Sequence, residues 1–177
     1  MSRGRRWITL LLVSLLAALT SVAAASPAHA VAFKQIPNYG NRKCLDVAAE
    51  NNTYVQLWHC ISGDQQQGWL ETLVDPGNNR WTFTNQRTGQ CLAVEGDAVT
   101  AQSRIVVNWC GSISARWHIL YAYNAGAGWH QQLQNVNSGL CLDLQWNNSA
   151  DGTPIWLWPC WNELNPLDGN TAQLWMM

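Results

Sequence analysis

Charged residues are scarce in this sequence. Ten Lys and Arg and eleven Asp and Glu make up 12% of its 177 residues, and the formal net charge is −1 at pH 7. A chain with so little positive charge is a poor candidate for binding nucleic acid or an anionic membrane surface. Its polar character comes from neutral Asn and Gln side chains, which accompany twelve tryptophans.

Helical periodicity and catalytic motifs are also missing. No stretch after residue 30 repeats apolar residues every 3.6 positions for long enough to predict a helix. The chain has no nucleophile elbow, no H-E-x-x-H and no phosphate-binding loop. Glu71, Glu95 and Glu163 fall at unmatched positions, so the carboxylate pair of a glycosidase has no visible candidate. These absences argue against an enzyme, and we expect no cofactor or metal.

The N-terminus has the features of a secretory signal peptide. Three arginines among the first six residues precede the apolar run WITLLLVSLLAALTSVAAA, and an A-x-A pattern ends at Ala30. A retained membrane anchor is the alternative, but Thr and Ser interrupt the run and the cleavage pattern follows at once. We expect residues 1–30 to be removed and residues 31–177 to be secreted without membrane insertion. The secreted part has seven Lys and Arg against eleven Asp and Glu, a net charge of −4.

A unit of about 50 residues is repeated three times in the secreted part. Each unit has a leading and a trailing cysteine, an asparagine six residues before the first, and a tryptophan after the second, in QGW, ARW and QLW. Nothing is left over for a second domain. We divide residues 31–177 into repeats α (31–78), β (79–128) and γ (129–177) of a single domain, which we expect to be a monomer.

The six cysteines all lie in these repeats. Zinc binding is one alternative for them, but the sequence has no C-x₂-C pair and only three histidines after residue 30. In an oxidising compartment, one disulfide in each repeat fits the pattern better. The predicted pairs are Cys44–Cys60, Cys91–Cys110 and Cys141–Cys160.

Short segments within each repeat have the composition of strands. RWTFTN, CLAV, RIVVNWC and RWHILYAY in repeat β are rich in β-branched and aromatic residues, and turn signals such as RTG and VEGD separate them. One unit cannot bury its own apolar face, so three units must share a core around a pseudo-threefold axis. We predict an all-β domain of about twelve strands, with Trp69, Trp117 and Trp175 equivalent in its core.

The three copies of C-L-D-V/L, V/I-Q-L-W-x-C and Q-x-W resemble the ricin B-chain type of β-trefoil lectin, which also occurs as carbohydrate-binding modules of secreted glycosidases. The resemblance covers essentially all of residues 31–177. It implies a β-trefoil with one potential sugar pocket in each repeat. Glycans or polysaccharides are then the expected partners.

The motif also has a physical basis in sugar recognition. An ionised Asp can accept hydrogen bonds from two neighbouring hydroxyl groups. An aromatic ring offers a flat face to the apolar C–H groups of the sugar ring. Amide side chains can donate and accept at the remaining hydroxyls.

Repeat α matches this set most fully. Asp46 follows Cys-Leu, and Gln56 and Trp58 lie four and two residues before the trailing cysteine. Gln66 stands where the family usually has an Asn, and the resemblance implies that Gln67 braces the aspartate. The chemistry fits galactose-type sugars or xylan- and arabinan-type sugars equally well.

Repeat γ matches in part, and repeat β does not match. Asp143, Trp158 and Gln173 stand at the expected positions of repeat γ, but Trp156 replaces the glutamine and Ala172 replaces an amide. We expect a weaker or altered site there. The corresponding residues of repeat β lack every ligand group, and they are Ala93, Val106, Asn108 and Ala115.

Other interpretations of these residues remain open. Asp46 and Asp143 could be turn carboxylates bound to backbone N–H groups, and Trp58 and Trp158 could be core rings. Tyr54, Trp146 and Trp161 are further candidates to extend the pockets. A β-trefoil that binds a protein partner instead of a sugar is the alternative function, because a fold does not fix a function.

Overall fold

The computed structural model describes residues 32–124, 128–161 and 171–177. They belong to one unit of the chain, residues 31–177. The predicted signal peptide and Glu163 lie outside the described residues. In the described ranges, none of the helices is long and apolar enough to cross a membrane.

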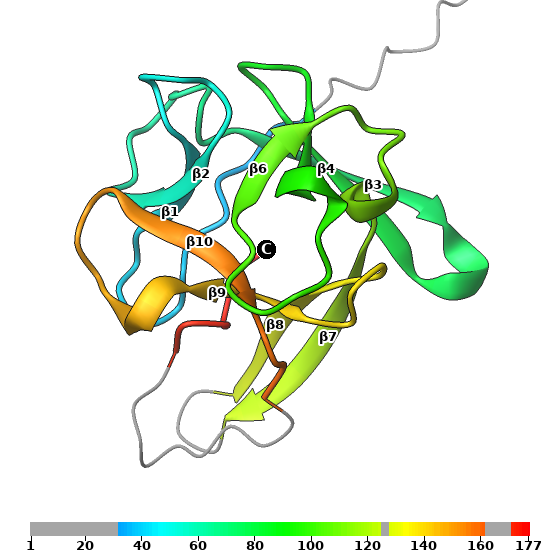
Figure 1. Cartoon of the computed structure of the whole chain (residues 1–177). Helices are drawn as coiled ribbons and strands as arrows, with labels where there is room; N and C mark the ends of the chain where they lie inside the picture. The colour runs from blue at the N-terminus through cyan, green and yellow to red at the C-terminus, as the bar shows by residue number, and fades with distance from the viewer. Residues whose placement is uncertain (1–31, 125–127, 162–170) are drawn as a thin grey trace, which may run out of the picture. The chain divides into compact units, whose positions relative to one another are not determined.

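Short antiparallel strands make up this unit, with no α-helix among the described residues (Figure 1). Four 3₁₀ turns interrupt them, η1 (Pro76–Asn78), η2 (Glu95–Asp97), η3 (Ile113–Ala115) and η4 (Gln145–Asn147). The ten strands assigned in the described residues are β1 (Cys44–Val47), β2 (Val55–Trp58), β3 (Trp69–Asp75), β4 (Arg80–Asn85), β5 (Cys91–Val94), β6 (Ile105–Asn108), β7 (Trp117–Asn124), β8 (Gly128–Asn135), β9 (Cys141–Leu144) and β10 (Thr153–Trp158).

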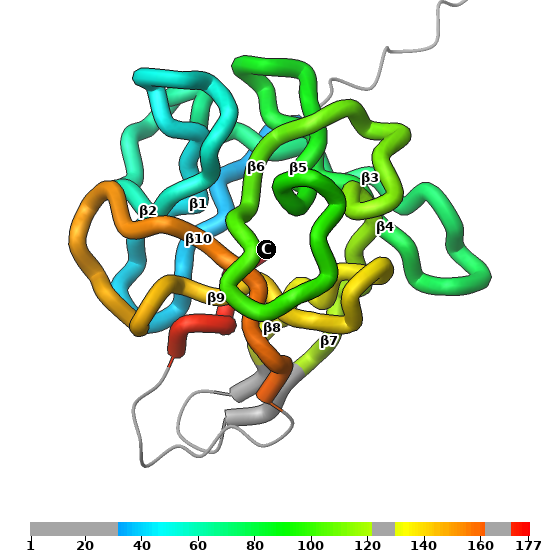
Figure 2. Tube along the Cα trace, in the orientation of Figure 1, coloured from blue at the N-terminus to red at the C-terminus, as the bar shows by residue number. Residues whose placement is uncertain are grey.

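The strands form one sheet in the order β1-β2-β10-β9-β8-β7-β4-β5-β6, and β3 pairs with β4. Within each repeat, the strand that begins at the leading cysteine pairs with the strand that precedes the trailing cysteine, as β1–β2, β5–β6 and β9–β10. The second strands of the three pairs also contact one another, which brings the repeats together. Figure 2 traces the chain from blue in repeat α through green in repeat β to orange and red in repeat γ.

Ten strands are assigned in the described residues where about twelve were expected, because the two ends of the domain form single bridges. Lys34 and Pro37 bridge to Trp69 and Cys44, in the way that the longer β4 pairs with β7 and β5. Trp175 makes single bridges to Asn38 and Gln131. Pro37 has no N–H to donate, which shortens the pairing at the N-terminal end.

Three equivalent tryptophans lie in the core, as the repeat predicts. Trp69, Trp117 and Trp175 are fully buried. Each indole N–H donates to the carbonyl of the leucine that follows the leading cysteine, at 3.0, 2.9 and 3.3 Å, and these leucines are Leu45, Leu92 and Leu142. Burial of the ring with its N–H satisfied explains why this position is Trp in all three repeats.

The repeated asparagine is also a framework residue. Asn38, Asn85 and Asn135 are fully buried. Each donates from Nδ2 to carbonyl groups near the core tryptophan and accepts backbone N–H groups of the turn that follows it. These bonds connect each turn to the core.

The disulfide prediction is confirmed. The pairs are Cys44–Cys60, Cys91–Cys110 and Cys141–Cys160, one within each repeat. Each bridge joins the start of the first strand of its pair to the residues that follow the second strand. The cysteines therefore hold the strand pair that carries the candidate ligand residues.

Candidate functional site

Repeat γ places a buried carboxylate opposite an indole. Asp143 in β9 faces Trp156 in β10 across the strand pair, and Trp156 Nε1 donates to Asp143 Oδ1 at 2.6 Å. Asp143 is only 4% exposed. Trp156 was expected to mark the loss of a glutamine, but its indole N–H supplies a donor to the aspartate. Sequence comparison of the repeats does not reveal this contact, because Trp and Gln are different residue types even though both side chains carry an N–H donor.

Gln173 supplies the second donor. Its Nε2 donates to Asp143 Oδ2 at 3.0 Å and to the Pro159 carbonyl at 2.9 Å, while its Oε1 accepts the Trp161 N–H at 3.1 Å. Each oxygen of Asp143 thus has one internal donor. A carboxylate oxygen has two lone-pair sites, so each can accept one more hydrogen bond from a ligand.

A cavity of about 190 Å³ opens beside this carboxylate. Trp158 is stacked on Trp156 with ring centroids 5.4 Å apart, and Trp146 meets Trp156 edge-on at 4.8 Å. Trp146 is 71% exposed. The cavity is lined by Asp143, Trp146, Asn147, Trp156, Trp158, Trp161 and Ala172. Repeat γ therefore combines an acceptor with flat apolar walls in one hollow.

Repeat α has the same arrangement around its aspartate. Asp46 faces Gln56 across β1 and β2, and Gln56 Nε2 donates to Asp46 Oδ1 at 2.9 Å. Asp46 is also 4% exposed. Gln67 Nε2 donates to the His59 carbonyl at 2.9 Å, and the Gln67 side chain acts to lower the pKa of Asp46. This is the position predicted for a bracing glutamine.

Burial raises the pKa of both aspartates. For Asp143 the removal from water is the largest effect, and hydrogen bonds from Trp156 and then Gln173 lower its pKa in part. Removal from water is also the largest effect on the pKa of Asp46, and the side chains of Gln56 and then Gln67 lower this pKa in part. Burial therefore makes the ionised form of each carboxyl less favourable in the folded protein than in the unfolded chain.

Two further glutamines, missed in the sequence analysis, donate to the glutamines beside the two aspartates. Gln35 Nε2 donates to Gln67 Oε1 at 2.8 Å, and Gln132 Nε2 donates to Gln173 Oε1 at 3.2 Å. Both lie three residues before the framework asparagine, where repeat β has Thr82. The signal was present in the repeat, because this position changes together with the aspartate.

The candidate residues of repeat α do not line one common cavity, in contrast to most of those of repeat γ. Gln66 Nε2 donates to the Val47 carbonyl at 3.2 Å, and Gln66 lines a cavity of about 390 Å³. Asp46, Gln56 and Trp58 are not part of its lining, which consists of Ala49, Asn52, Gly63, Asp64, Gln65, Gln66 and Arg87. Of the candidate α residues, Gln66 is therefore the one that lines this cavity.

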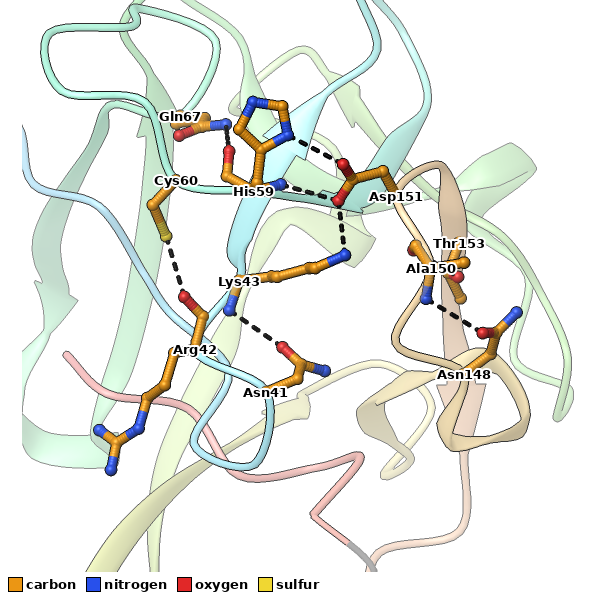
Figure 3. Close-up of polar contacts among 10 residues, drawn as sticks. All are labelled: Asn41, Arg42, Lys43, His59, Cys60, Gln67, Asn148, Ala150, Asp151 and Thr153. Atoms are coloured by element: carbon orange, nitrogen blue, oxygen red, sulfur yellow. Dashed lines mark hydrogen bonds and ion pairs between the residues drawn. The ribbon is translucent and has the colours of Figure 1, made fainter.

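A loop of repeat γ packs against repeat α. Asp151 accepts hydrogen bonds from the backbone N–H and the ring Nδ1 of His59, at 3.0 and 2.8 Å, and lies 2.8 Å from Lys43 Nζ (Figure 3). A Cβ placed on Gly152 would lie 3.9 Å from the Trp58 ring. Gly152 has a φ of +83°, which favours glycine at this close approach. The loop of repeat γ therefore lies close to the Trp58 ring.

Repeat β fills the equivalent position with apolar side chains. Ala93 and Ala115 are fully buried, Val106 is nearly so, and these residues pack together with Cys91. Asn108 is exposed at the end of β6. The three residues that replace the aspartate and its two donors are all apolar, so no polar group is left unpaired among them.

The three aromatic candidates have different outcomes. Trp146 and Trp161 line the γ cavity. Tyr54 does not lie in the α cavity, since it packs against the apolar cluster of repeat β and bridges to Val106. The segment before β2 reaches across to the next repeat, which the spacing within one repeat does not reveal.

Comparisons with known proteins agree with this architecture. Among solved structures, the designed threefold-symmetric protein ThreeFoil has a TM-score of 0.66 and 20% identity, with 81% of this chain and 95% of that chain covered. The Macrolepiota procera ricin B-like lectin in complex with lactose has a TM-score of 0.63 and 19% identity, with 85% and 96% covered. The exo-β-1,3-galactanase 1,3Gal43A of Clostridium thermocellum has a TM-score of 0.65 and 21% identity, with 84% of this chain but 30% of that chain covered.

These structural matches establish the β-trefoil fold. No curated protein matches the chain. The family model of the ricin-type β-trefoil lectin domain-like proteins matches residues 30–108 and residues 72–158, which together cover most of the chain. The chain therefore belongs to the ricin-type β-trefoil lectin domain-like family.

Proposed function

We propose that this protein binds carbohydrate non-covalently at the γ site and at the α site. The observation that carries the proposal is Asp143, a buried carboxylate with two internal donors at the wall of a tryptophan-lined cavity. Its free acceptor positions suit two neighbouring hydroxyl groups, and Trp158 offers a flat surface to the C–H face of a sugar ring. Asp46, Gln56, Trp58 and Gln66 form the corresponding set in repeat α, with Gln67 as its brace.

Galactose-containing glycans are the first ligands to test. The Macrolepiota procera lectin structure contains lactose, and the Clostridium thermocellum protein is a galactanase. Xylan- and arabinan-type polysaccharides offer the same paired hydroxyls and C–H faces and stand beside galactose as candidates. We further propose a secreted monomer, residues 31–177, from which residues 1–30 have been removed.

Two weak sites favour a polymeric or clustered ligand. A shallow site of this kind should bind with a dissociation constant of about 0.1–1 mM, or roughly 4–5 kcal/mol. When one polymer occupies both sites, the second binding event becomes intramolecular and the combined affinity rises well above either one.

A glycan array followed by a retention assay on polysaccharide tests the function. Asp46→Ala and Asp143→Ala should each weaken retention, and the double variant should lose more than the two single losses predict. Asp75→Ala is a control, since this half-buried carboxylate lies at the end of β3 and contacts Asn78 and Arg80. No response to any simple sugar or polysaccharide would reject the proposal.

Exposed apolar side chains in repeat β favour a second candidate, a protein-binding module. Trp109 is 72% exposed and Ile113 is 62% exposed. A protein partner at this surface would be lost on Trp109→Ala and unaffected by Asp143→Ala. The array experiment separates the two functions, because only the carbohydrate proposal requires a sugar response.

A further inference from the structure

The γ cavity combines one carboxylate with walls that are mostly aromatic. Among the described residues that line it, Asp143 is the only charged one and Asn147 is the only amide. Ala172 occupies the position at which the repeat pattern predicts a second amide. The remaining four lining residues are tryptophans, so the walls are mainly indole rings.

The charge of Asp143 has no cationic partner among the described residues. The four ion pairs that these residues form do not include Asp143. Its two donors, Trp156 and Gln173, are both neutral. A buried carboxylate in this state is best compensated by a ligand that brings positive charge.

The indole rings favour the same kind of ligand. The face of an indole is electrically negative and attracts cations that lie within about 6 Å of the ring centre. Trp146 and Trp156 meet at an interplanar angle of 72°, whereas Trp156 and Trp158 are within 15° of parallel. A ligand between these rings and Asp143 therefore faces negative charge on several sides while its C–H groups contact apolar surface.

We propose that the γ site prefers sugars that carry a free, protonated amino group over neutral and N-acetylated sugars. This inference rests on the proposed carbohydrate function and specifies the class of sugar for one of its two sites. The ammonium group would donate to the open positions of Asp143 Oδ1 and Oδ2, and the ring of the same sugar would stack on Trp158. An N-acetyl group removes the charge and adds a carbonyl acceptor.

Calorimetric titration at pH 7 with galactosamine, galactose and N-acetylgalactosamine tests the preference. The protein carries Asp46→Ala, which removes the α site so that binding at repeat γ is measured. Galactosamine should bind about tenfold more tightly than the other two sugars, because hydrogen bonds to charged groups are stronger than neutral ones. Glucosamine and glucose repeat the comparison with a different hydroxyl orientation.

Two further variants assign the preference to its residues. Asp143→Asn keeps the shape of the side chain and should reduce the ratio of galactosamine to galactose affinity to about one. Trp146→Ala removes a largely exposed ring, so it leaves the fold intact, and it should reduce the ratio several-fold. Asp75→Asn removes one charge far from these residues in the sequence and should leave the ratio unchanged.

The outcomes separate this inference from the function on which it rests. Equal binding of galactosamine and galactose, or a preference that survives Asp143→Asn, would overturn the inference and leave carbohydrate binding in place. If none of these sugars bound while the protein with Asp46 intact bound other glycans, the γ site would be inactive and the inference wrong. If no glycan bound to either form, both proposals would fail.

Discussion

Repeats β and γ share a framework, but they differ in the residue at the position of the candidate aspartate, on the first strand of each strand pair. In repeat γ the position holds Asp143 with two donors around it. In repeat β it holds Ala93 in an apolar cluster with Val106 and Ala115. The disulfide, the core tryptophan and the turn asparagine are present in both.

The difference shows that two kinds of constraint act on one repeat. Framework residues occupy buried positions on which the shared core depends, so all three repeats need them. Asp143, Trp156 and Gln173 form a unit, since removing one leaves buried polar groups of the others unpaired. Repeat β has replaced every member of this unit by an apolar residue, and its stability does not depend on the lost groups.

Removing a core tryptophan should have the largest effect, and it should be similar in the two repeats. We expect Trp117→Ala or Trp175→Ala to cost about 3–5 kcal/mol of unfolding free energy, because each leaves a large cavity and an unpaired carbonyl. Urea titration measures the loss. Trp109→Ala, an exposed tryptophan of repeat β, should change stability by less than about 0.5 kcal/mol. A small loss for Trp117→Ala alone would show that the framework is not shared.

Disulfide removal should be the next largest effect. Replacing both cysteines by serine in repeat β or in repeat γ should cost about 3 kcal/mol in each case, because both bridges span 19 residues. Only the variant of repeat γ should also lose affinity for sugar, since Cys141 pairs with Trp158 across the strands. Thermal unfolding and glycan titration of the same samples check the two statements, and equal loss of affinity would contradict them.

Placing an aspartate in repeat β should reduce the unfolding free energy by less than these changes. It tests whether the aspartate and its donors act as a unit. We expect Ala93→Asp to destabilise the fold by about 2 kcal/mol, since a carboxyl there is buried without donors. Adding Val106→Gln and Ala115→Gln supplies the two glutamines that repeat α has at these positions and should recover part of the loss. Denaturant titration of the single and triple variants measures the recovery. No recovery would mean that the donors do not act as a unit with the aspartate.

The pH dependence should be the smallest effect and should have opposite signs for stability and for binding. Because burial raises the pKa of Asp143 above 3.8, the native state binds more protons than the unfolded state between 3.8 and the raised value. Its contribution to stability therefore falls as pH rises through this window. Sugar affinity should rise in the same window, because the ionised carboxylate is the better acceptor.

Asp143→Asn provides the control for this prediction. The variant should lose the share of the pH dependence that belongs to repeat γ, in both unfolding and binding measurements. Asp97 and Asp151 do not interfere, because hydrogen bonds from Ser112 and from Lys43, the largest influences, lower their pKa values. Their effects on stability appear at and below 3.8. An unchanged profile would show that Asp143 is not the titrating group.

The framework could be predicted from the sequence because it repeats. Three equivalent tryptophans, three asparagines and the three leading cysteines identify buried positions without any knowledge of contacts between repeats. The strand count was less accurate, because Pro37 and the chain ends reduce two expected strands to single bridges. Such end effects break the symmetry on which the prediction relied.

The candidate site was only partly predictable. The aspartates and their glutamines follow from the repeat, but the donor role of Trp156 depends on where its indole nitrogen lies. Likewise, Gly152 near Trp58 and Tyr54 against repeat β are contacts between repeats. Sequence spacing within one repeat carries no information about them.

Two-dimensional NMR of the tryptophan indole N–H groups tests the central claim most directly. The protein is titrated with the glycan selected by the array, and each signal is assigned by single substitution. We predict saturable shifts at Trp156 and Trp158 in repeat γ and at Trp58 in repeat α, with Trp109 and Trp117 of repeat β unchanged. Shifts at Trp109 with Trp156 and Trp158 unaffected would contradict the account, because the ligand would then bind at the repeat that has no carboxylate.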